Sequence, residues 1–535
     1  MTITEGLMYK VLIPSAGLGT RLGEFSKNLN KALVQVDNKP VISHVIEKFP
    51  KHIEIVIALG HKADSLKQYL LSAHSDRNIT IVNISNYCGD GSGLGLTILK
   101  CKEHLQSPFI FCPNDTLILE EIPEPTKNWL GYSVVDNTNS YRTLQLGEHN
   151  KILKINEKNE SKKDKVNAYI GLAGIKDFNK FWASMEHGIK YGSIKIGEAY
   201  GLNKLIESSI DVQAKKFTWY DTGNLSSLKI AKEKLTRKDA PEILEKKDEA
   251  IWFVNDKVIK YNNDKNFILN RVNRAKKLKG FVPEIIFSTE NMYSYREITG
   301  QVLSKVSTRK NFVKLMSYLD SFWKLENTVI DEELFKSTCL KFYKDKTEKR
   351  TKLYFDRYGE KDTEEVVNGE KLPTLKHMLD KIDWDWMSTG KPVRFHGDLH
   401  FENILLSETG DFFLLDWRQD FGGLMNYGDL YYDLAKLLHG LIMSHSLVNK
   451  NLFTINKVDN VVKYDFHRKN ILVENEKQLE NFVINQNLDW KKVRLLTALV
   501  FLNIAPLHHY PYSKLLFYLG KDMLYSELRK NNATT

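Results

Sequence analysis

One short segment near the start of the chain combines residue types that handle phosphate groups. Residues 15–22 read SAGLGTRL directly after an apolar run, and Lys31 follows ten positions after Arg21. The glycines at 17 and 19 allow backbone N–H groups to face an anion without a Cβ in the way. Because Arg21 and Lys31 add two positive charges, the segment predicts a loop that binds a nucleoside triphosphate.

Two other phosphate-binding patterns do not fit this loop. A dinucleotide-binding turn needs G-x-G-x-x-G at the start of a helix and an acid about 20 residues later. Here Leu22 follows GLGTR, no such acid ends the second strand, and the Walker lysine motif is missing. The structural alternative is an ordinary glycine-containing turn that binds nothing. The positions of Arg21 and Lys31 after the glycines argue against this alternative.

A second segment has the spacing of a kinase catalytic loop. Residues 396–403 read HGDLHFEN, so Asp398 and Asn403 keep the D-x4-N arrangement of base and metal ligand. The following apolar stretch, DFFLLDW, ends in Asp416, where a second metal ligand is needed. Upstream, Lys260 lies in VIKY after an expected hairpin, a position suited to pairing with the phosphates of ATP. An isolated D-x4-N occurs by chance, but this conjunction favours a kinase.

The elements around these segments fall into two groups. Over the first 235 residues, short apolar strands alternate with helical patterns, which predicts a doubly wound α/β fold, Rossmann-like in type. The charged stretch TRKDAPEILEKKDEA then has the character of a linker. After it, AIWFVNDKVIKY predicts a hairpin, and from Phe267 onward we expect helices with one short strand pair near Asp416. The predicted domains are 1–237 and 251–535, the latter two-lobed and protein-kinase-like (α+β), with a linker at 238–250.

Composition excludes several classes of protein. The 535 residues, 42% hydrophobic and 27% charged, are too many for one core and match a globular chain of two or three domains. The net charge of +10 comes from scattered lysines, so we expect no nucleic-acid partner. The sequence contains no run of about 18 apolar residues, so we expect no membrane span. Four cysteines without CxxC spacing indicate a reducing compartment, so a cytoplasmic location is expected. The oligomeric state stays open.

The first half resembles a known enzyme family. GLGTRL followed by NKALVQVDNKPVISHVIEKF is similar to the signature of the sugar-phosphate and phosphocholine nucleotidyltransferases. The order of later segments also resembles that family: VIALGHKADSLKQYL, GDGSGLGLTILKC, IFCPNDTLI, NAYIGLAGI and WYDTGNLSSLKIAKEKL. The resemblance covers residues 8–235. It implies that a phosphate monoester attacks the α-phosphorus of an NTP, with pyrophosphate leaving.

The same resemblance implies roles for individual residues. Arg21 and Lys31 would be catalytic, and Asp115 and Asp221 would share a Mg²⁺ ion, which prefers oxygen ligands. The implied nucleotide-binding residues are Ala16, Gly17, Gly19, Thr20, Gly91 and Ser92. As structural alternatives, Asp115 suits a turn and Asp221 a helix start. Asn30 and Asn114 stand where the family often has proline and glycine.

The second half resembles another family. HGDLHFEN, LLDWR and YYDLAKLLHGL are similar to motifs of the aminoglycoside phosphotransferases and choline kinases, over about residues 245–515. The resemblance implies that Asp398 activates an acceptor hydroxyl and that Asn403 and Asp416 hold metal. It also implies that Lys260 contacts the phosphates of ATP, and that Tyr295 and Glu297 lie near the hinge that contacts adenine. The helix after Lys260, FILNRVNRAKKL, offers no acid to pair with that lysine.

Together the two halves predict a bifunctional enzyme. A kinase domain would phosphorylate a small hydroxyl compound with ATP, and a transferase domain would couple the phosphate to an NTP, CTP first and UTP second. The product would be an activated precursor for a cell-surface glycan such as capsule or lipopolysaccharide. Three alternatives are a choline kinase joined to a phosphocholine cytidylyltransferase, a scaffold with one inactive domain, and an antibiotic kinase, which leaves the first 235 residues without a role.

The residues after Asp416 bear on the acceptor. A choline site needs an aromatic cage and nearby carboxylates. Trp417 is a candidate for the cage, but Arg418 follows it and would repel a cation. We therefore expect a neutral or anionic alcohol in place of choline. The alternative is that Arg418 faces solvent or pairs with Asp420.

Overall fold

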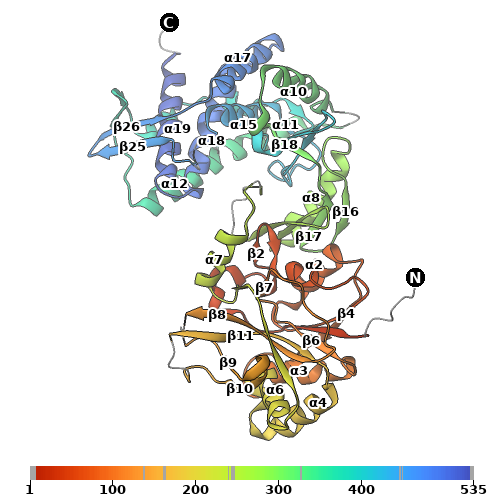
Figure 1. Ribbon diagram of the computed structural model, residues 1–535. Helices are drawn as coiled ribbons and strands as arrows, with labels where there is room; N and C mark the ends of the chain where they lie inside the picture. Colours follow the sequence, from red (N-terminus) through yellow and green to blue (C-terminus); the bar gives the residue numbers. More distant parts are fainter. Residues whose placement is uncertain are drawn as a thin grey trace. The chain divides into compact units, whose positions relative to one another are not determined.

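The computed structural model describes residues 8–136, 139–160, 164–238, 240–241, 248–325, 328–444, 448 and 450–530. The chain divides into two compact units (Figure 1). The first comprises Met1–Lys265 and Ile286–Glu297, and the second comprises Asn266–Ile285 and Ile298–Thr535. Most of the predicted linker, namely residues 239 and 242–247, lies outside the described residues.

A nine-stranded mixed sheet organises the first unit. Its strand order is β10-β9-β11-β6-β1-β4-β5, and β8 joins β11 to β12. The strands β6, β1, β4 and β5 run parallel, as the predicted doubly wound fold requires. The bounds are β1 (Lys10–Ser15), β4 (Glu54–Leu59), β5 (Ile79–Asn83), β6 (Phe109–Phe111), β8 (Asn128–Asp136), β9 (Thr143–Leu146), β10 (Ile152–Asn156), β11 (Lys165–Ile175) and β12 (Val212–Lys216).

Helices cover both faces of this sheet. Val11 and Ile13 belong to one buried cluster and Leu12 to another, because successive side chains of a strand point to opposite faces. Helices α1 (Val41–Ile46), α2 (Ala63–Ala73) and α7 (Leu225–Leu235) contribute to the first cluster. Helices α3 (Leu94–Lys100), α4 (Phe178–His187) and α6 (Glu198–Glu207) contribute to the second. Burial on both sides accounts for the continuous apolar sequence of the parallel strands.

A four-stranded sheet with the order β14-β15-β17-β16 also packs on the first unit. Its strands are β14 (Glu249–Val254), β15 (Lys257–Asn262), β17 (Met292–Arg296) and β16 (Ile285–Ser288). The predicted hairpin turn is confirmed, because Asn255 and Asp256 have positive φ angles of 48° and 56°, as a tight two-residue turn requires.

This smaller sheet packs against α2. The rings of Tyr69 and Trp252 meet edge-on with centroids 5.1 Å apart, and the Ser72 hydroxyl donates to the Ser294 hydroxyl at 3.1 Å. Trp252 therefore lies in the same buried cluster as α1 and α2. This packing explains why the compact units divide later than the predicted boundary at 238–250; the domain limits themselves stay a prediction.

The second unit is mainly helical, with the catalytic loop set among short strands. Strands β18 (Gly300–Val302), β22 (Ile404–Ser407) and β23 (Phe412–Leu414) form one sheet. The larger helices are α8 (Lys265–Lys277), α10 (Arg309–Phe322), α11 (Glu332–Leu340), α12 (Lys346–Tyr358), α15 (Leu430–Ile442), α17 (Asn470–Asn485), α18 (Trp490–Ile504) and α19 (Tyr512–Arg529). A π-helical segment, η6 (Lys341–Asp345), joins α11 to α12.

The expectation of a single strand pair after Phe267 is wrong. Besides β16 and β17, this region contains a sheet with the order β20-β19-β26-β25. Its strands are β19 (Glu365–Val367), β20 (Glu370–Leu372), β25 (Phe453–Val458) and β26 (Val461–Phe466). Their sequences are short and rich in polar residues, so they lack the apolar runs that mark the strands of the first unit.

Candidate functional sites

The loop after β1 brings its glycines against Lys31. Gly19 has a φ of 69°, in the left-handed region that favours glycine. A Cβ at Gly19 would lie 2.8 Å from the Cβ of Lys31, so the loop and the lysine approach each other more closely than a larger residue permits. Thr20 begins a short 3-10 helix, η1 (Thr20–Ser26), which carries Arg21.

Asn30 fixes the start of the segment that carries Lys31. Its buried amide nitrogen donates to the carbonyls of Ser15 at 3.0 Å and His61 at 2.7 Å, and its oxygen accepts from the Ala32 N–H at 3.0 Å. Ser15 ends β1 and His61 follows β4. Asn30 thus anchors the lysine to the carboxyl ends of two parallel strands, the edge where ligands bind in open α/β sheets.

Lys31 forms an ion pair with one of the two predicted metal ligands. Its Nζ lies 3.0 Å from Asp115 Oδ2, with about a fifth of each side chain exposed. Burial alone would raise the pKa of Asp115, but the charge and hydrogen bond of Lys31, together with the charge of Arg21, hold the pKa below its ordinary value. Asn114 supports this position by donating its amide to the Ser15 hydroxyl at 2.9 Å.

The second predicted metal ligand is brought to the first by a strand pair. Strand β13 (Trp219–Asp221) pairs antiparallel with β7 (Thr116–Ile118), which places Asp221 opposite Thr116. The next residue, Thr222, donates its N–H to the carbonyl of Asp115 at 3.0 Å.

Gly223 marks the point on which the site converges. A Cβ placed there would lie 3.0 Å from Asp221 Oδ1, 3.2 Å from Asp115 Oδ2 and 3.3 Å from Arg21 Nη2. Two carboxylates and a guanidinium therefore surround one position that only glycine leaves open. Carboxylate oxygens are the ligands that Mg²⁺ prefers, and it commonly takes one or two of them besides phosphates and waters, so the residues fit this ion.

Tyr141 is a site residue that the sequence analysis missed. Its hydroxyl donates to Asp221 Oδ2 at 3.0 Å, and Asn224 donates to the same oxygen at 3.1 Å. Burial and the charge of Asp221 raise the pKa of Tyr141 to about 12, so the phenol stays protonated and keeps Asp221 oriented. A lone tyrosine between two polar stretches gives no signal in the sequence.

Two of the predicted nucleotide-binding residues, Gly91 and Ser92, lie in one turn near the surface. Gly91 has a φ of 74°, and the Ser92 hydroxyl donates to the carbonyl of Gly89 at 2.7 Å. The segment before this turn packs close to the loop that follows β1. A Cβ at Gly60 would lie 2.7 Å from the Ala16 carbonyl oxygen and 2.9 Å from the Cβ of Tyr87.

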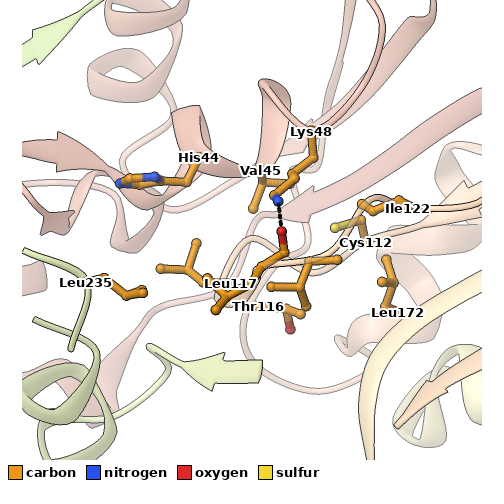
Figure 2. Close-up of a pocket in the computed structure, with 11 residues that line it drawn as sticks. His44, Val45, Lys48, Cys112, Thr116, Leu117, Ile122, Leu172 and Leu235 are labelled. Carbon is orange, nitrogen blue, oxygen red and sulfur yellow. Dashed lines mark hydrogen bonds between the residues drawn. The ribbon is translucent and has the colours of Figure 1, made fainter. Parts of the chain in front are cut away.

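A cavity of about 260 Å³ in the first unit is separate from these residues. Figure 2 shows its mainly apolar lining, with Val45, Leu117 and Leu172 around it and Lys48 donating to the carbonyl of Leu119 at 2.8 Å. Since no predicted site residue lines the cavity, it takes no part in the proposed chemistry.

In the second unit, the predicted catalytic base is paired with a buried lysine. Asp398 Oδ1 lies 2.7 Å from Lys436 Nζ, and the Asn403 amide donates to the Asp398 carbonyl at 2.9 Å. Although burial would raise the pKa of Asp398, the charge and hydrogen bond of Lys436, together with His400, hold this pKa well below its ordinary value. Asp398 is therefore ionised near neutral pH.

The backbone of the catalytic loop is fixed by Asp433 of α15. Its carboxylate accepts the N–H groups of His396 at 2.8 Å and Gly397 at 2.7 Å, and the Trp323 indole N–H at 3.1 Å. Burial raises the pKa of Asp433 to about 6. Asp433 and Lys436 were missed as site residues, although charged residues within the apolar sequence YYDLAKLLHGL were a signal for them.

His396 connects the loop to the strand that carries Asp416. Burial lowers its pKa to about 3, so the imidazole is neutral. In the tautomer that fits, Nδ1 accepts from the Asp398 N–H at 3.2 Å and Nε2 donates to the Leu415 carbonyl at 2.8 Å. The Leu415 N–H in turn donates to the Asn403 carbonyl at 2.7 Å, which holds Asp416 beside the loop.

Asp416 meets an arginine of α8. Its φ of 56° is unusual for a residue other than glycine, and its Oδ1 lies 2.8 Å from Arg271 Nη1. The helix expected to offer an acid to Lys260 thus presents arginines to the catalytic region, because Arg274 also donates to the carbonyls of Phe395 and Arg418, each at 2.6 Å.

The two predicted acceptor residues have different surroundings. Trp417 is fully buried and its indole N–H donates to the Arg271 carbonyl at 3.0 Å, so the geometry does not support a role in binding an acceptor. Arg418 is partly exposed, with its guanidinium carbon 5.0 Å from the centre of the Phe342 ring.

The remaining predicted ATP-binding residues belong to the first unit. Lys260 is buried in β15, with its Nζ 5.9 Å from the centre of the Tyr295 ring. Glu297 follows β17 and donates its N–H to the Asp256 carbonyl at 2.8 Å. The loop that carries Asp398 belongs to the second unit.

Within the described residues, no group of three or more His, Cys, Asp or Glu side chains is arranged to hold a metal ion. Each predicted metal site offers two oxygen-bearing side chains, Asp115 with Asp221 and Asn403 with Asp416. No helix in the described parts of the chain is long and apolar enough to span a membrane.

Comparisons with known proteins confirm the two resemblances. Residues 342–449 match the phosphotransferase enzyme family, APH. The Bifunctional protein GlmU of Methanococcus vannielii is 29% identical over 206 residues, covering 37% of this chain and 48% of the relative. GlmU of Methanococcus maripaludis is 28% identical over 221 residues, covering 40% of this chain and 51% of the relative. The chain thus spans about half the length of the curated relatives that it matches.

Among solved structures, CTP:phosphocholine cytidylyltransferase (LicC) from Streptococcus pneumoniae is 20% identical, with a TM-score of 0.35, and covers 42% of this chain and 99% of that one. A UDP-glucose pyrophosphorylase in complex with UDP-glucose is 18% identical, with a TM-score of 0.35, and covers 42% and 98%. The predicted α/β fold class is confirmed: a nucleotidyltransferase-like N-terminal part precedes an APH kinase-like domain.

Proposed function

We propose that this chain is a bifunctional enzyme that first phosphorylates a small alcohol with ATP and then joins the resulting phosphate monoester to an NTP. The observation that carries the proposal is that one chain assembles two separate clusters of charged residues, each of a kind suited to phosphate chemistry. One contains Arg21, Lys31, Asp115 and Asp221, and the other is built around Asp398. A scaffold with one inactive domain would not need both clusters to keep their charged residues.

For nucleotidyl transfer, the chain mainly neutralises charge and aligns the reacting groups, because attacker and electrophile are both anionic. Backbone N–H groups around Gly17 and Gly19 bind the terminal phosphates of the NTP together with Arg21. Lys31 lies between the α-phosphate and the acceptor phosphate. The α-phosphorus–oxygen bond to pyrophosphate breaks as the bond to the monoester oxygen forms.

For phosphorylation, Asp398 accepts the proton of the acceptor hydroxyl while the oxygen attacks the γ-phosphorus of ATP and ADP leaves. Asp433 holds the loop backbone, and Lys436 keeps Asp398 ionised. Lys260 binds ATP phosphates, and Glu297 lies near the adenine.

Mg²⁺, held by Asp115 with Asp221 and by Asn403 with Asp416, would supply further charge neutralisation at both phosphate centres. The oxygen donors at each site support this choice of ion.

The nucleotide is CTP as first choice and UTP as second, and the product is an activated precursor for a cell-surface glycan made in the cytoplasm. The similarity of the first-unit motifs to phosphocholine and sugar-phosphate nucleotidyltransferases supports this order of preference.

The proposal is tested by incubating the full chain with ATP, each of the four NTPs in turn and a panel of alcohols, followed by mass spectrometry. We expect a phosphate monoester and an NDP-linked product to form in the same mixture, the second only when the right NTP is present. Formation of ADP and monoester with no nucleotide-linked product from any NTP, even when the monoester is supplied directly, would contradict the bifunctional assignment.

A further inference from the structure

We propose that the alcohol phosphorylated by the second unit carries an anionic group, a carboxylate, phosphonate or phosphate, and that Lys346, Arg350 and Arg418 bind it. The inference rests on the proposed kinase function and specifies the class of its acceptor.

Two of these cations share one aromatic ring. The Nζ of Lys346 lies 4.4 Å from the centre of the Phe342 ring, and the guanidinium carbon of Arg418 lies 5.0 Å from it. Lys346 also donates to the Tyr432 hydroxyl at 3.3 Å. Phe342 belongs to the π-helical segment η6, and such segments are frequent at functional sites.

Arg350 lies one helical turn after Lys346 on α12. Residues at i and i+4 share a helix face, so the two cations point the same way. Burial lowers the pKa of both side chains, and Arg418 lowers each further, which places all three positive charges within electrostatic reach of one another.

The protein supplies little negative charge in return. Within the described parts of the chain, no carboxylate forms an ion pair with Lys346, Arg350 or Arg418. Asp398, the nearby carboxylate, is already paired with Lys436 at 2.7 Å. The Nε of Arg418 is buried without a hydrogen-bond partner among the described residues. Because grouped, partly desolvated charges of one sign are costly, an anionic ligand would relieve this arrangement.

Arg418 and Lys346 also contact residues beside Asp398. Arg418 packs against the catalytic loop, since a Cβ at Gly397 would lie 2.6 Å from Arg418 Cβ. Tyr432, which Lys346 contacts, is one turn before Lys436 on α15, and Lys436 contacts the base Asp398. An acceptor that reaches Asp398 with its hydroxyl therefore has its other end beside these cations.

The same geometry argues against choline. A quaternary ammonium needs open aromatic faces and a nearby carboxylate. The Phe342 ring is already contacted by Lys346 and Arg418, and Tyr432 by Lys346 with its Nζ 5.4 Å from the ring centre. Trp417, the residue expected to form the cage, is buried and offers no open face to an ammonium group.

A competing explanation is that the three cations hold the γ-phosphate of ATP. The two explanations differ in which KM responds to a substitution. Arg418→Gln, Lys346→Met and Arg350→Gln each remove one charge. Lys349→Met is the matched control, because Lys349 is exposed on the same helix.

The kinetic test compares glycerol, glycerate, glycerol 3-phosphate and choline as acceptors. We expect kcat/KM for an anionic acceptor at least about tenfold above glycerol and choline. Each of the three variants should raise the acceptor KM about tenfold, as expected for a lost charge-assisted hydrogen bond, with the ATP KM changing less than twofold. Preference for glycerol or choline, or an increase confined to the ATP KM, would overturn the inference.

If none of these alcohols is a substrate, a binding measurement with inorganic phosphate still tests the inference. With the ATP site filled by a non-hydrolysable ATP analogue and Mg²⁺, calorimetry should detect inorganic phosphate binding, weakened about tenfold by Arg418→Gln and unchanged by Lys349→Met. Absence of phosphate binding to the native chain would refute the anion site. Phosphate binding without phosphorylation of any alcohol would instead refute the proposed kinase function.

Discussion

Both candidate sites place a lysine against the carboxylate that the chemistry needs. Lys31 pairs with Asp115 and Lys436 with Asp398, and in each pair the lysine, together with other nearby groups, lowers the pKa of the aspartate against the effect of burial. Removing one partner of such a pair leaves an uncompensated, partly buried charge, which costs far more than losing an exposed pair. These lysines therefore help to set the charge state of the two aspartates.

At this scale, Lys31→Ala should lower kcat/KM for nucleotidyl transfer about 10²- to 10³-fold, the range for losing one preorganised charge-stabilising donor. The measurement is pyrophosphate release with a supplied phosphate monoester. Lys27→Ala is the control, because Lys27 is in the same loop with its side chain about half exposed. An unchanged rate in Lys31→Ala would remove Lys31 from the site.

Glu198 provides a pH-dependent prediction. It begins α6, its Oε2 is buried without a hydrogen-bond partner among the described residues, and burial raises its pKa from 4.5 to about 7, partly countered by Arg142. The folded state therefore holds a proton that the unfolded chain releases, so this group's contribution to stability is present at low pH and is lost as pH rises from about 4.5 to 7.

Glu198→Gln removes that loss. The variant should gain stability over the native chain as pH rises to 7, up to about 3 kcal/mol, and the difference should be constant at higher pH. Thermal unfolding followed between pH 5 and 8 measures it. A Tm difference that does not change with pH would show that Glu198 has an ordinary pKa.

At the scale of elements, the sequence predicted what local patterns determine. The parallel strands are apolar on both faces, and the hairpin turn Asn255–Asp256 has its own residue signature, so both were predicted correctly. Strands such as β25 and β26 alternate polar and apolar residues and were missed. Arg418 was predicted as an acceptor residue, but Lys346 and Arg350 were missed, because only the packing of α12 brings them to Arg418, which is distant in sequence.

Helix α8 carries arginines where an acidic partner for Lys260 was expected. The expected acid is absent, and Arg274 instead ties the helix to the carbonyls of Phe395 and Arg418. Burial lowers the pKa of Arg274 to about 9, and its guanidinium carbon lies 4.0 Å from the centre of the Phe395 ring.

Arg274→Met should therefore destabilise the protein by about 2–4 kcal/mol, since one buried and one partly buried carbonyl lose their donors. Lys277→Met, at an exposed position of the same helix, should change stability by less than about 0.5 kcal/mol. Chemical denaturation of both variants compares them. Equal stability of the two would mean that Arg274 does not anchor α8.

At the scale of the whole molecule, the sheet β14-β15-β17-β16 lies almost entirely within the predicted kinase domain, 251–535, yet it packs into the core of the first unit. Trp252, Ile259 and Met292 are buried in the same cluster as the α1 and α2 side chains. Cutting the chain at the predicted linker would expose this apolar face.

A fragment of residues 251–535 should consequently self-associate and bind a hydrophobic dye, as large exposed apolar patches do. Size-exclusion chromatography and dye fluorescence, with the full chain as reference, test this. A monomeric fragment that unfolds cooperatively and binds no dye would show that the sheet does not need its partner in the first unit.

The central claim is that one chain carries two chemically independent sites, and the most direct measurement follows both products in Asp398→Asn and Lys31→Ala. With ATP, alcohol and NTP, Asp398→Asn should form no phosphate monoester yet make the nucleotide-linked product when the monoester is supplied. Lys31→Ala should accumulate the monoester without converting it. Loss of both activities together in either well-folded variant would contradict the account.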